Sequence, residues 1–577
     1  MPRVRQSAAS PPPRARSSRK SISLATIAVI VVSLAASLSV LLNDFTQDDL
    51  GIIRASTRLH GFGEWKDMLT LPYWPPPALP DLYRPLLSLF LAFQYVAGNG
   101  APAVFRVVSC LLYAGACAGV LRVAARMLPL PVALGVALLF AAHPVHVEAI
   151  ALAVAQNEIL VALLATLMVA RYLDKRRREP DGALQPADWG LLLLGAAAAA
   201  FSKEQGLLLP LFLGAAEWCL VRGQSLRERI HLLWKGYAAL ALVGALALAA
   251  RSAVLGSQRP AMIADALRDL TMRERALTML QVVPEWFRLL TWPAHLRAEY
   301  SPNEFVASTT FGAVEAFGLA LLIGAVVVAW LARRRMPVVT FGLLWCFIAL
   351  LPVSNVVIPT GILIAERTLF LASAGFLLAA GGVAAGVLNV LDTRWSLSER
   401  APLRYASIVV FAAVVLVGVT RSVRRERVWH DPFTLVAASL EDSPRSWRVQ
   451  RQYGEMMFES GRPGDGIVGF LKAISLSPEP WRVRNRFAQR MRGVGADSVA
   501  FEELKRSNSE HPGEPETIVQ IASVLITLGQ YDETIRLADQ IISAANAPDV
   551  MVYLRHVADS ARTAKAPRGS VRLSLGM

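Results

Sequence analysis

Long apolar runs recur along most of this chain and constrain its fold more than any other feature. A helix needs about 20 apolar residues to cross a hydrocarbon core of roughly 30 Å. About eleven apolar runs fall at 22–42, 104–124, 128–142, 147–170, 188–201, 205–221, 234–254, 311–332, 337–353, 368–391 and 405–421, of which 128–142 and 188–201 are short for a span. The sequence therefore predicts an all-α fold, a polytopic membrane helical bundle of about eleven spans followed by a soluble helical tail.

The first apolar run follows a basic tail, residues 1–21, that holds six Arg or Lys and no acidic residue. This run is longer than the apolar part of a typical signal peptide, and it ends in Asn43-Asp44-Phe45 without a small-residue cleavage site. We therefore expect a retained membrane anchor.

The basic clusters follow the predicted spans in alternation. They lie at 122–126, 174–178, 222–235, 333–335 and 394–404. If the N-terminus is cytoplasmic, each of these clusters falls on the cytoplasmic side, as the positive-inside rule requires, whereas the basic stretch 421–427 falls outside. This accounts for the net charge of +15 without nucleic acid as a partner. The loops 43–103 and 255–310 and the whole tail are then extracytoplasmic, and two shorter apolar stretches, 86–97 and 277–292, are predicted to be interfacial helices.

After residue 429 the sequence becomes polar and repetitive. Prolines recur at 444, 478 and 512, and glycines at 461, 495 and 529, each series with a period of 34 residues. This spacing is typical of tetratricopeptide repeats, paired helices that stack into an α-solenoid and bind peptides or proteins. The predicted organisation is listed here in chain order: a basic tail 1–21, a membrane domain 22–425, a repeat domain 430–562 with repeats near 447–480, 481–514 and 515–548, and a basic tail 563–577.

All four cysteines lie inside apolar runs, which excludes a disulfide scaffold and a thiolate zinc site. The Ala-, Leu- and Arg-rich composition suits a multi-pass protein of a bacterial inner membrane, with a periplasmic repeat domain.

Polar residues gather at the predicted outer ends of the spans, where a charge is costly unless it is paired, wet or functional. Asp48 and Asp49 follow the first span. Two adjacent carboxylates repel, so one of them can acquire a raised pKa and act as a general base; the alternative is that both only cap the next helix.

Further polar groups follow in the later outer turns. His143, His146 and Glu148 precede Asn157 and Glu158, and this cluster suits a phosphate or sugar, with a metal site as the alternative. Lys203 and Glu204 lie at a join between two spans, where they form either a functional pair or a structural one. Asn355, Glu366 and Arg367 flank the start of a later span, and the guanidinium of Arg367 suits a lipid phosphate by charge and geometry.

Taken in order, these motifs resemble a known family. The series comprises Asp48-Asp49, Tyr83-Arg84-Pro85-Leu86, His143-Pro144-x-His146-x-Glu148, Asn157-Glu158, Ser202-Lys203-Glu204 and Ala365-Glu366-Arg367, followed by the repeat tail. It is similar to the transmembrane and tetratricopeptide-repeat-containing protein O-mannosyltransferases and their bacterial relatives, of the C-type superfamily of membrane glycosyltransferases. The resemblance covers residues 20 to about 545.

The resemblance implies an inverting enzyme that transfers a sugar, mannose in the family, from a polyprenyl-phosphate donor to a hydroxyl of an exported protein. It implies that Asp48 or Asp49 is the base, with Asp49 preferred. The residues implied to bind the donor phosphate are Arg84, His143, His146, Lys203 and Arg367. The residues implied to support the pocket are Glu148, Asn157, Glu158, Glu204, Glu299, Tyr300, Asn355 and Glu366, where Glu299 replaces the Asp that the family often has.

No metal is required in this interpretation, because the lipid phosphate leaves as a stable anion. The expected partners are the donor, the exported acceptor protein, a peptide or protein bound by the repeats, and membrane lipid. Two alternatives remain: transfer of the sugar to a lipid or a cell-envelope glycan, and a non-enzymatic membrane scaffold or transporter.

Overall fold

The computed structural model describes residues 19–76, 81–179, 182–221, 223–256, 263–300, 303–395, 401–544 and 548–565. Most of the two predicted basic tails lies outside these ranges. The chain divides into two compact units. Unit 1 comprises residues 1–263, 269–296 and 308–432, and unit 2 comprises residues 264–268, 297–307 and 433–577.

The described residues form helices and connecting turns with no β-strand, which confirms the predicted all-α fold. Seven helical segments of unit 1 are long and apolar enough to cross a membrane, and a bent pair adds an eighth if it counts as one span. The seven are Arg19–Leu42 (α1 and η1), Pro102–Ala124 (α4), Gln156–Arg178 (α7), Arg227–Leu255 (in α10), Ala313–Arg335 (α12), Glu366–Arg394 (η9 and α14) and Ala401–Trp429 (α15 and η11). The bent pair is Leu130–Ala141 (α5) with Pro144–Ala151, and it turns by 47°.

Every predicted span falls on a helix, but several of these helices are shorter than the roughly 20 residues that a membrane span needs. The short ones are α5, α8 (Pro186–Ser202), α9 (Leu209–Leu220) and α13 (Pro337–Leu350). At 1.5 Å per residue, the 12 residues of α9 reach only about 18 Å. The predicted run 147–170 is also not one helix, because it breaks between α6 (Val147–Ala151) and α7.

Local signals in the sequence explain where these helices begin. Proline occupies the first turn of α4, α5, α8 and α13, where its missing N–H costs nothing. Ser225 begins α10 (Leu226–Leu255) and Thr271 begins α11 (Met272–Thr291), each in a capping box with a glutamate three residues later.

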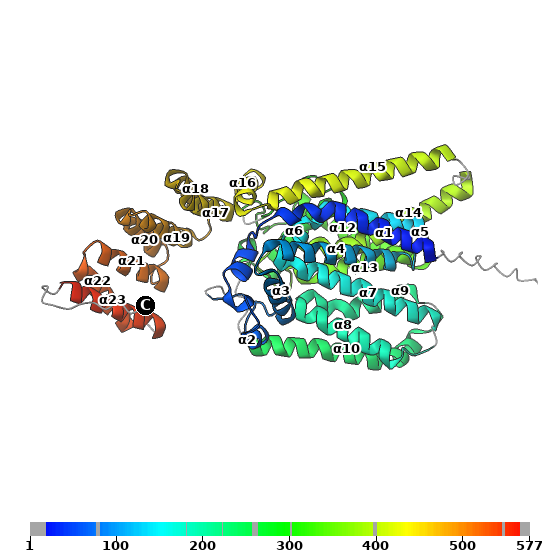
Figure 1. Ribbon diagram of the computed structural model, residues 1–577, viewed down its shortest axis with the longest axis horizontal. Coiled ribbons are helices and arrows are strands. Elements are labelled where there is room, and N and C mark those ends of the chain that lie inside the picture. The colour runs from blue at the N-terminus through cyan, green and yellow to red at the C-terminus, as the bar shows by residue number, and fades with distance from the viewer. Residues whose placement is uncertain are drawn as a thin grey trace, which may run out of the picture. The chain divides into compact units, whose positions relative to one another are not determined.

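The centre of unit 1 is built from α4, α7, α13 and α14 (Phe370–Trp395), with α4 packed on α7 and α13 packed on α14. The apolar stretches of α10, α12 and α15 (Ala401–Glu426) are by contrast mostly exposed. Figure 1 shows α10 and α15 at opposite edges of this helical body. Apolar faces without protein cover are typical of helices in contact with lipid.

The first and last spans are tied to each other at one end. The hydroxyl of Ser39 donates to the carboxylate of Glu426 at the end of α15, and the Asn43 side-chain amide donates to the Glu426 carbonyl at 2.9 Å. The Asp44 N–H then donates to the His430 carbonyl at 2.8 Å. The loop that carries Asp48 is therefore anchored by the last span of unit 1.

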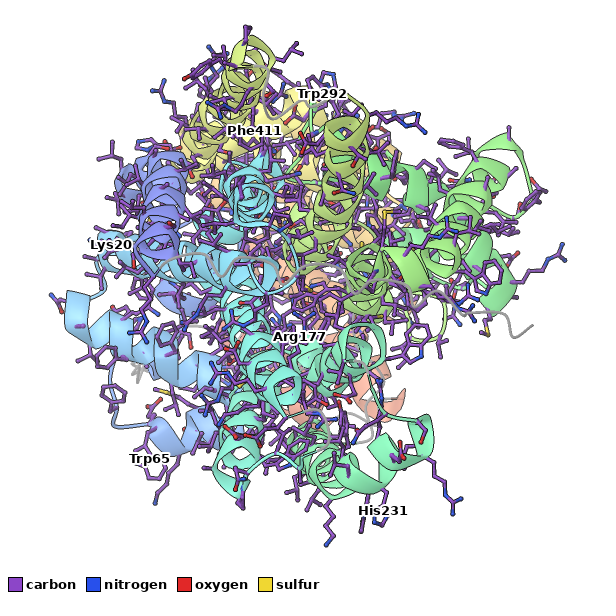
Figure 2. All side chains as sticks on the ribbon, turned by 90° about the vertical axis from the view of Figure 1, so that its right-hand side faces the viewer. Lys20, Trp65, Arg177, His231, Trp292 and Phe411 are labelled. Atoms are coloured by element: carbon purple, nitrogen blue, oxygen red, sulfur yellow. The ribbon has the colours of Figure 1, made fainter. Side chains whose placement is uncertain are left out.

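Basic residues from several unit 1 helices lie at one end of the unit. The start of α1, the end of α7 and the start of α10 lie at the right-hand end in Figure 1, whereas α2 (Trp65–Thr70) and α6 lie at the left. Figure 2 views the right-hand end and labels Lys20, Arg177 and His231 on these three helices. The basic clusters assigned to the cytoplasm from the sequence thus include members that share one end of unit 1.

The two stretches predicted to be interfacial helices are both helical, as α3 (Pro85–Gly98) and α11. Neither meets the length and hydropathy required of a membrane span. Their location in the interface stays a prediction.

Unit 2 consists largely of short helices in antiparallel succession. They are α16 (Pro432–Asp442), α17 (Trp447–Glu459), α18 (Pro463–Leu476), α19 (Pro480–Gly493), α20 (Asp497–Glu510), α21 (Pro515–Thr527), α22 (Tyr531–Ala544) and α23 (Pro548–Lys565). Each stretch predicted as a repeat contains two of them. The recurring glycines Gly461, Gly495 and Gly529 all have a left-handed backbone, with φ of 70°, 77° and 73°, which explains why glycine recurs at the turn between the helices of a pair. Phe470 and Phe487 stack in the core at 5.2 Å between ring centroids.

Candidate active site

The turn after the first span places its two carboxylates in different surroundings. Gln47 has a left-handed backbone, with φ of 45°, and the Asp49 N–H donates to the Thr46 carbonyl at 3.1 Å. Asp49 is fully buried at the start of η2 (Leu50–Arg54), whereas the Asp48 side chain is 36% exposed.

The Asp49 carboxylate is held by three donors. Arg106 of α4 donates at 3.1 Å, and the backbone N–H groups of Ala153 and Val154 donate at 3.0 and 2.9 Å. The two amides belong to η5 (Ala153–Ala155), the short turn between α6 and α7. Asp49 therefore accepts hydrogen bonds from backbone N–H groups at the break between α6 and α7, as a capping carboxylate does.

Burial raises the pKa of Asp49, against the opposing effects of the Arg106 charge and the two amide donors. A raised pKa is the property expected of a general base, yet this carboxylate already accepts hydrogen bonds from three protein donors. This geometry argues against the preference for Asp49 as the base and favours Asp48.

Arg367 lies between Asp48 and Glu148. Its backbone N–H and its Nη1 donate to the two carboxylate oxygens of Glu148, at 2.8 and 2.7 Å, and its Nη2 lies 3.7 Å from Asp48 Oδ2. Arg367 is in η9 (Glu366–Leu369), and Glu148 is in α6. The two hydrogen bonds to Glu148 fix the guanidinium beside the partly exposed carboxylate of Asp48.

Two further ion pairs lie near this triad. Lys203 donates to Glu158 in the first turn of α7, and both side chains are buried. Arg84, at the start of α3, donates to Glu204 at 2.8 Å, and Arg251 of α10 approaches the other oxygen of Glu204 at 3.3 Å.

Burial alone raises the pKa of Glu204, but the charge and hydrogen bond of Arg84 outweigh this effect and lower it to about 2.

These pairs belong to one charged cluster. Arg367 interacts electrostatically with Glu158 as well as with Glu148 and Asp48. Arg84 likewise interacts with Glu158 as well as with Glu204. The members are the carboxylates Asp48, Glu148, Glu158 and Glu204 and the cations Arg84, Lys203, Arg251 and Arg367. The cluster joins residues that are more than 300 positions apart in the sequence.

The two histidines do not fit the predicted role of phosphate ligands. His143 contacts the Leu290 carbonyl through Nε2 at 3.2 Å, and its Nδ1 accepts from the Val145 N–H at 3.3 Å. His146 is fully buried, with Nδ1 at 3.1 Å from the Tyr113 hydroxyl and Nε2 at 2.8 Å from Ser373 Oγ. Because both ring nitrogens are engaged in each case, these residues position α6 and are not available to a donor.

Other residues predicted to support the pocket are buried or bonded to backbone groups of their own loops. Asn355 has a left-handed backbone, with φ of 54°. Its side chain donates to the Ile362 carbonyl and accepts from the Thr360 N–H, which closes the loop before η9. Asn157 and Glu366 are buried at the starts of α7 and η9.

Glu299 and Tyr300 belong to unit 2. The Glu299 carbonyl accepts from Ser443 Oγ, and the Tyr300 hydroxyl accepts from the Arg297 N–H at 3.3 Å.

Two residues of the site region were missed by the sequence reasoning. Arg106, the partner of Asp49, lies inside an apolar span, and an arginine in such a place is itself a signal. Tyr73, which interacts electrostatically with Arg84, Asp48 and Arg367, comes from a proline-rich loop with no recognisable motif.

Within the described residues, no group of three or more His, Cys, Asp or Glu side chains is arranged to hold a metal ion.

Comparison with known proteins gives a consistent set of relatives, although no family model matches the chain. Mouse protein O-mannosyl-transferase TMTC3 is 24% identical over 468 residues, which cover 75% of this chain and 49% of the relative. Human protein O-mannosyl-transferase TMTC4 is 26% identical, over 66% of this chain and 56% of the relative. Protein O-mannosyl-transferase Tmtc2 of Drosophila melanogaster is 33% identical over a shorter stretch, 28% of this chain and 18% of the relative.

The chain spans about half the length of the curated relatives that it matches. The similarity to TMTC proteins extends over most of the chain itself, at 22–26% identity, and it agrees with the family resemblance found in the motifs. The chain is a homologue of the TMTC protein O-mannosyl-transferases.

Proposed function

We propose that the chain is an inverting membrane glycosyltransferase that transfers a sugar, mannose by analogy with the names of its relatives, from a polyprenyl-phosphate donor to a hydroxyl of an exported protein. The observation that carries this proposal is the half-open carboxylate of Asp48 beside the fixed guanidinium of Arg367. A base and an anion-binding cation within a few ångströms of each other are the two groups that such a transfer needs.

The proposed reaction is a single displacement. Asp48 takes the proton of the acceptor hydroxyl as its oxygen forms a bond to the anomeric carbon. The bond from that carbon to the phosphate oxygen breaks, and the electron pair leaves with the lipid phosphate. Attack opposite the leaving group inverts the configuration of the anomeric carbon.

Arg367 has a defined part in this scheme, because its charge stabilises the phosphate anion as it forms. Glu148 holds the guanidinium in place through two contacts, which limits the reorganisation needed during the reaction. Arg84 and Lys203 add positive charge to the same cluster. No metal is invoked, since protein cations neutralise the leaving group in this proposal.

The proposal includes an orientation. The basic end that Figure 2 shows is assigned to the cytoplasm by the positive-inside rule, so the site is extracytoplasmic. The proposed location is a bacterial inner membrane with the repeat domain in the periplasm, where that domain binds a peptide segment of the acceptor protein.

The experiment is a transfer assay with the purified full chain. Labelled polyprenyl-phosphate-mannose and a peptide acceptor are supplied, and the expected product is a mannosylated serine or threonine with the anomeric configuration opposite to that of the donor. Activity unchanged by a chelator is also expected. Retention of configuration would contradict the displacement, and label found only in lipid or glycan would favour the alternative acceptors.

A further inference from the structure

Tyr73 occupies a firmly held position beside the charged cluster. It lies in the loop between α2 and α3, where its N–H donates to the Leu82 carbonyl at 2.7 Å. Arg58 donates to the Tyr73 carbonyl at 2.9 Å. The side chain is only 2% exposed, and the Arg84 guanidinium lies over its ring, 5.6 Å from the centroid. Both the backbone and the ring are thus fixed by neighbouring groups.

The hydroxyl of Tyr73 is buried and has no hydrogen-bond partner among the described residues. A buried polar group without a partner carries the full cost of its lost hydration, and most such groups in proteins are paired. Two other tyrosines of unit 1 follow that rule, because the hydroxyl of Tyr83 donates to the Leu69 carbonyl at 2.8 Å and that of Tyr113 to the Ala141 carbonyl at 3.0 Å. Like several other buried polar groups of the described residues, the Tyr73 hydroxyl has no protein partner, and its interaction with the charged cluster places it where it can bond a ligand.

The surroundings define the chemistry of that ligand. Burial raises the pKa of Tyr73 well above its ordinary value, so the phenol stays protonated and can donate a hydrogen bond at neutral pH. The buried Nε of Arg84 likewise has no partner among the described residues. Two unused donors, the Tyr73 hydroxyl and the Nε of the guanidinium that lies over the Tyr73 ring, match the oxygens of an anion better than the mixed donors and acceptors of a sugar.

We propose that the Tyr73 hydroxyl and the Arg84 guanidinium donate hydrogen bonds to phosphate oxygens of the polyprenyl-phosphate donor, which makes Tyr73 a donor-binding residue. This inference rests on the proposed function and adds a neutral donor to a phosphate site that otherwise consists of cations. It assigns Tyr73, in the described segment that follows α2, to donor recognition.

The test is direct binding of a polyprenyl phosphate to the full chain in detergent, with the matching polyprenol as a probe that lacks the phosphate. The variant is Tyr73→Phe, which removes only the hydroxyl. We expect the dissociation constant for the polyprenyl phosphate to rise about tenfold to a hundredfold, as for a lost hydrogen bond to a charged group. Binding of the polyprenol should not change, and the melting temperature without lipid should be unchanged or higher, because an unpaired buried hydroxyl is removed.

Tyr83→Phe is the matched control, since it removes a hydroxyl of the same loop that is already paired with a backbone carbonyl. It should lower the melting temperature and leave the affinity for polyprenyl phosphate unchanged. If wild type binds polyprenyl phosphate and Tyr73→Phe binds it equally well, the inference about Tyr73 is overturned while the proposed function stands. If wild type binds neither polyprenyl phosphate nor polyprenyl-phosphate-mannose, the proposed function fails and the inference fails with it.

Discussion

Asp48 and Asp49 are neighbours in the chain, but they face different surroundings. Asp49 is enclosed by Arg106 and two backbone amides, whereas Asp48 is partly exposed beside Arg367. The two carboxylates can therefore be separated experimentally by measuring transfer and stability on the same variants.

Asp48→Asn should abolish most of the proposed transfer while the protein remains folded. Loss of a general base lowers the rate by roughly 10²- to 10⁴-fold, and a half-exposed side chain contributes little to stability. Transfer rate and melting temperature are measured together. Asp174→Asn is the control, because Asp174 is also 36% exposed and also pairs with an arginine; near-normal transfer by Asp48→Asn would refute its role as the base.

Asp49→Asn should act mainly on stability. The buried guanidinium of Arg106 loses its counter-charge, and removal of one partner of a buried pair costs about 3–5 kcal/mol. Thermal unfolding in detergent measures this loss, and expression of folded protein should fall with it. A variant with wild-type stability and no transfer would instead restore Asp49 as the base.

Glu204 provides a prediction for pH. Its folded pKa of about 2 lies below the ordinary 4.5, so its contribution to stability is complete above about pH 4.5 and is lost as the pH falls toward 2. Glu204→Gln should therefore have a lower melting temperature than wild type at pH 7, and the difference should shrink between pH 5 and pH 3. A difference that stays constant over this range would contradict the pairing with Arg84.

At this scale the sequence indicated which residues gather but not how each one is used. Charge and order along the chain were enough to select Asp48, Glu148, Lys203 and Arg367, because polar groups are rare at the ends of apolar spans. The burial and the hydrogen-bond partners of each side chain could not be predicted from charge and order along the chain. Asp49 is enclosed because the chain breaks at Ala153, and no local pattern announces that break.

At the scale of helices, close contact between α13 and α14 depends on glycine. A Cβ on Gly342 would lie 2.5 Å from the Gly375 carbonyl oxygen and from the Ala379 nitrogen. Small residues allow this approach of backbones, which is typical of packed membrane helices. The contact supports η9 directly, because α14 continues from it.

Gly342→Ala should destabilise unit 1 by about 1–3 kcal/mol, as other overpacked cores do. Gly324→Ala in α12 is the matched control, because a Cβ there would meet nothing within 4 Å. The melting temperature of the control should be unchanged or slightly higher, since alanine favours a helix over glycine. Equal melting temperatures for the two variants would mean that the helices can separate without cost.

The helices also show what hydropathy can and cannot predict. All eleven predicted runs are helical, because a long apolar segment has few other ways to satisfy its backbone in lipid. Their lengths were less predictable. The run 147–170 is apolar apart from a few polar residues such as Glu148 and Glu158, and its helix is broken at η5, where the Asp49 carboxylate accepts hydrogen bonds from two backbone amides.

At the scale of the whole chain, the proposed topology can be tested by cysteine labelling. A membrane-impermeant maleimide applied to intact cells should label Ser460→Cys in unit 2 but label Arg335→Cys, at the end of α12, only after the membrane is opened. The wild-type chain gives the background, since its four cysteines lie in apolar helices. Labelling of both sites in intact cells, or the reverse order, would contradict the assignment of the basic end to the cytoplasm.

The contact of Glu426 with Ser39 and Asn43 has a consequence for biogenesis. A membrane protein inserts its helices as they are synthesised, so the loop with Asp48 enters the membrane region early and α15 enters last among the unit 1 helices. Until residues 426–430 arrive, the backbone and side-chain groups of residues 39–44 lack the partners that anchor them in the finished protein. The loop that carries Asp48 is therefore fixed in one late step. A chain interrupted before α15 would contain every charged residue of the cluster, but the loop around Asp48 would lack the contacts that anchor it.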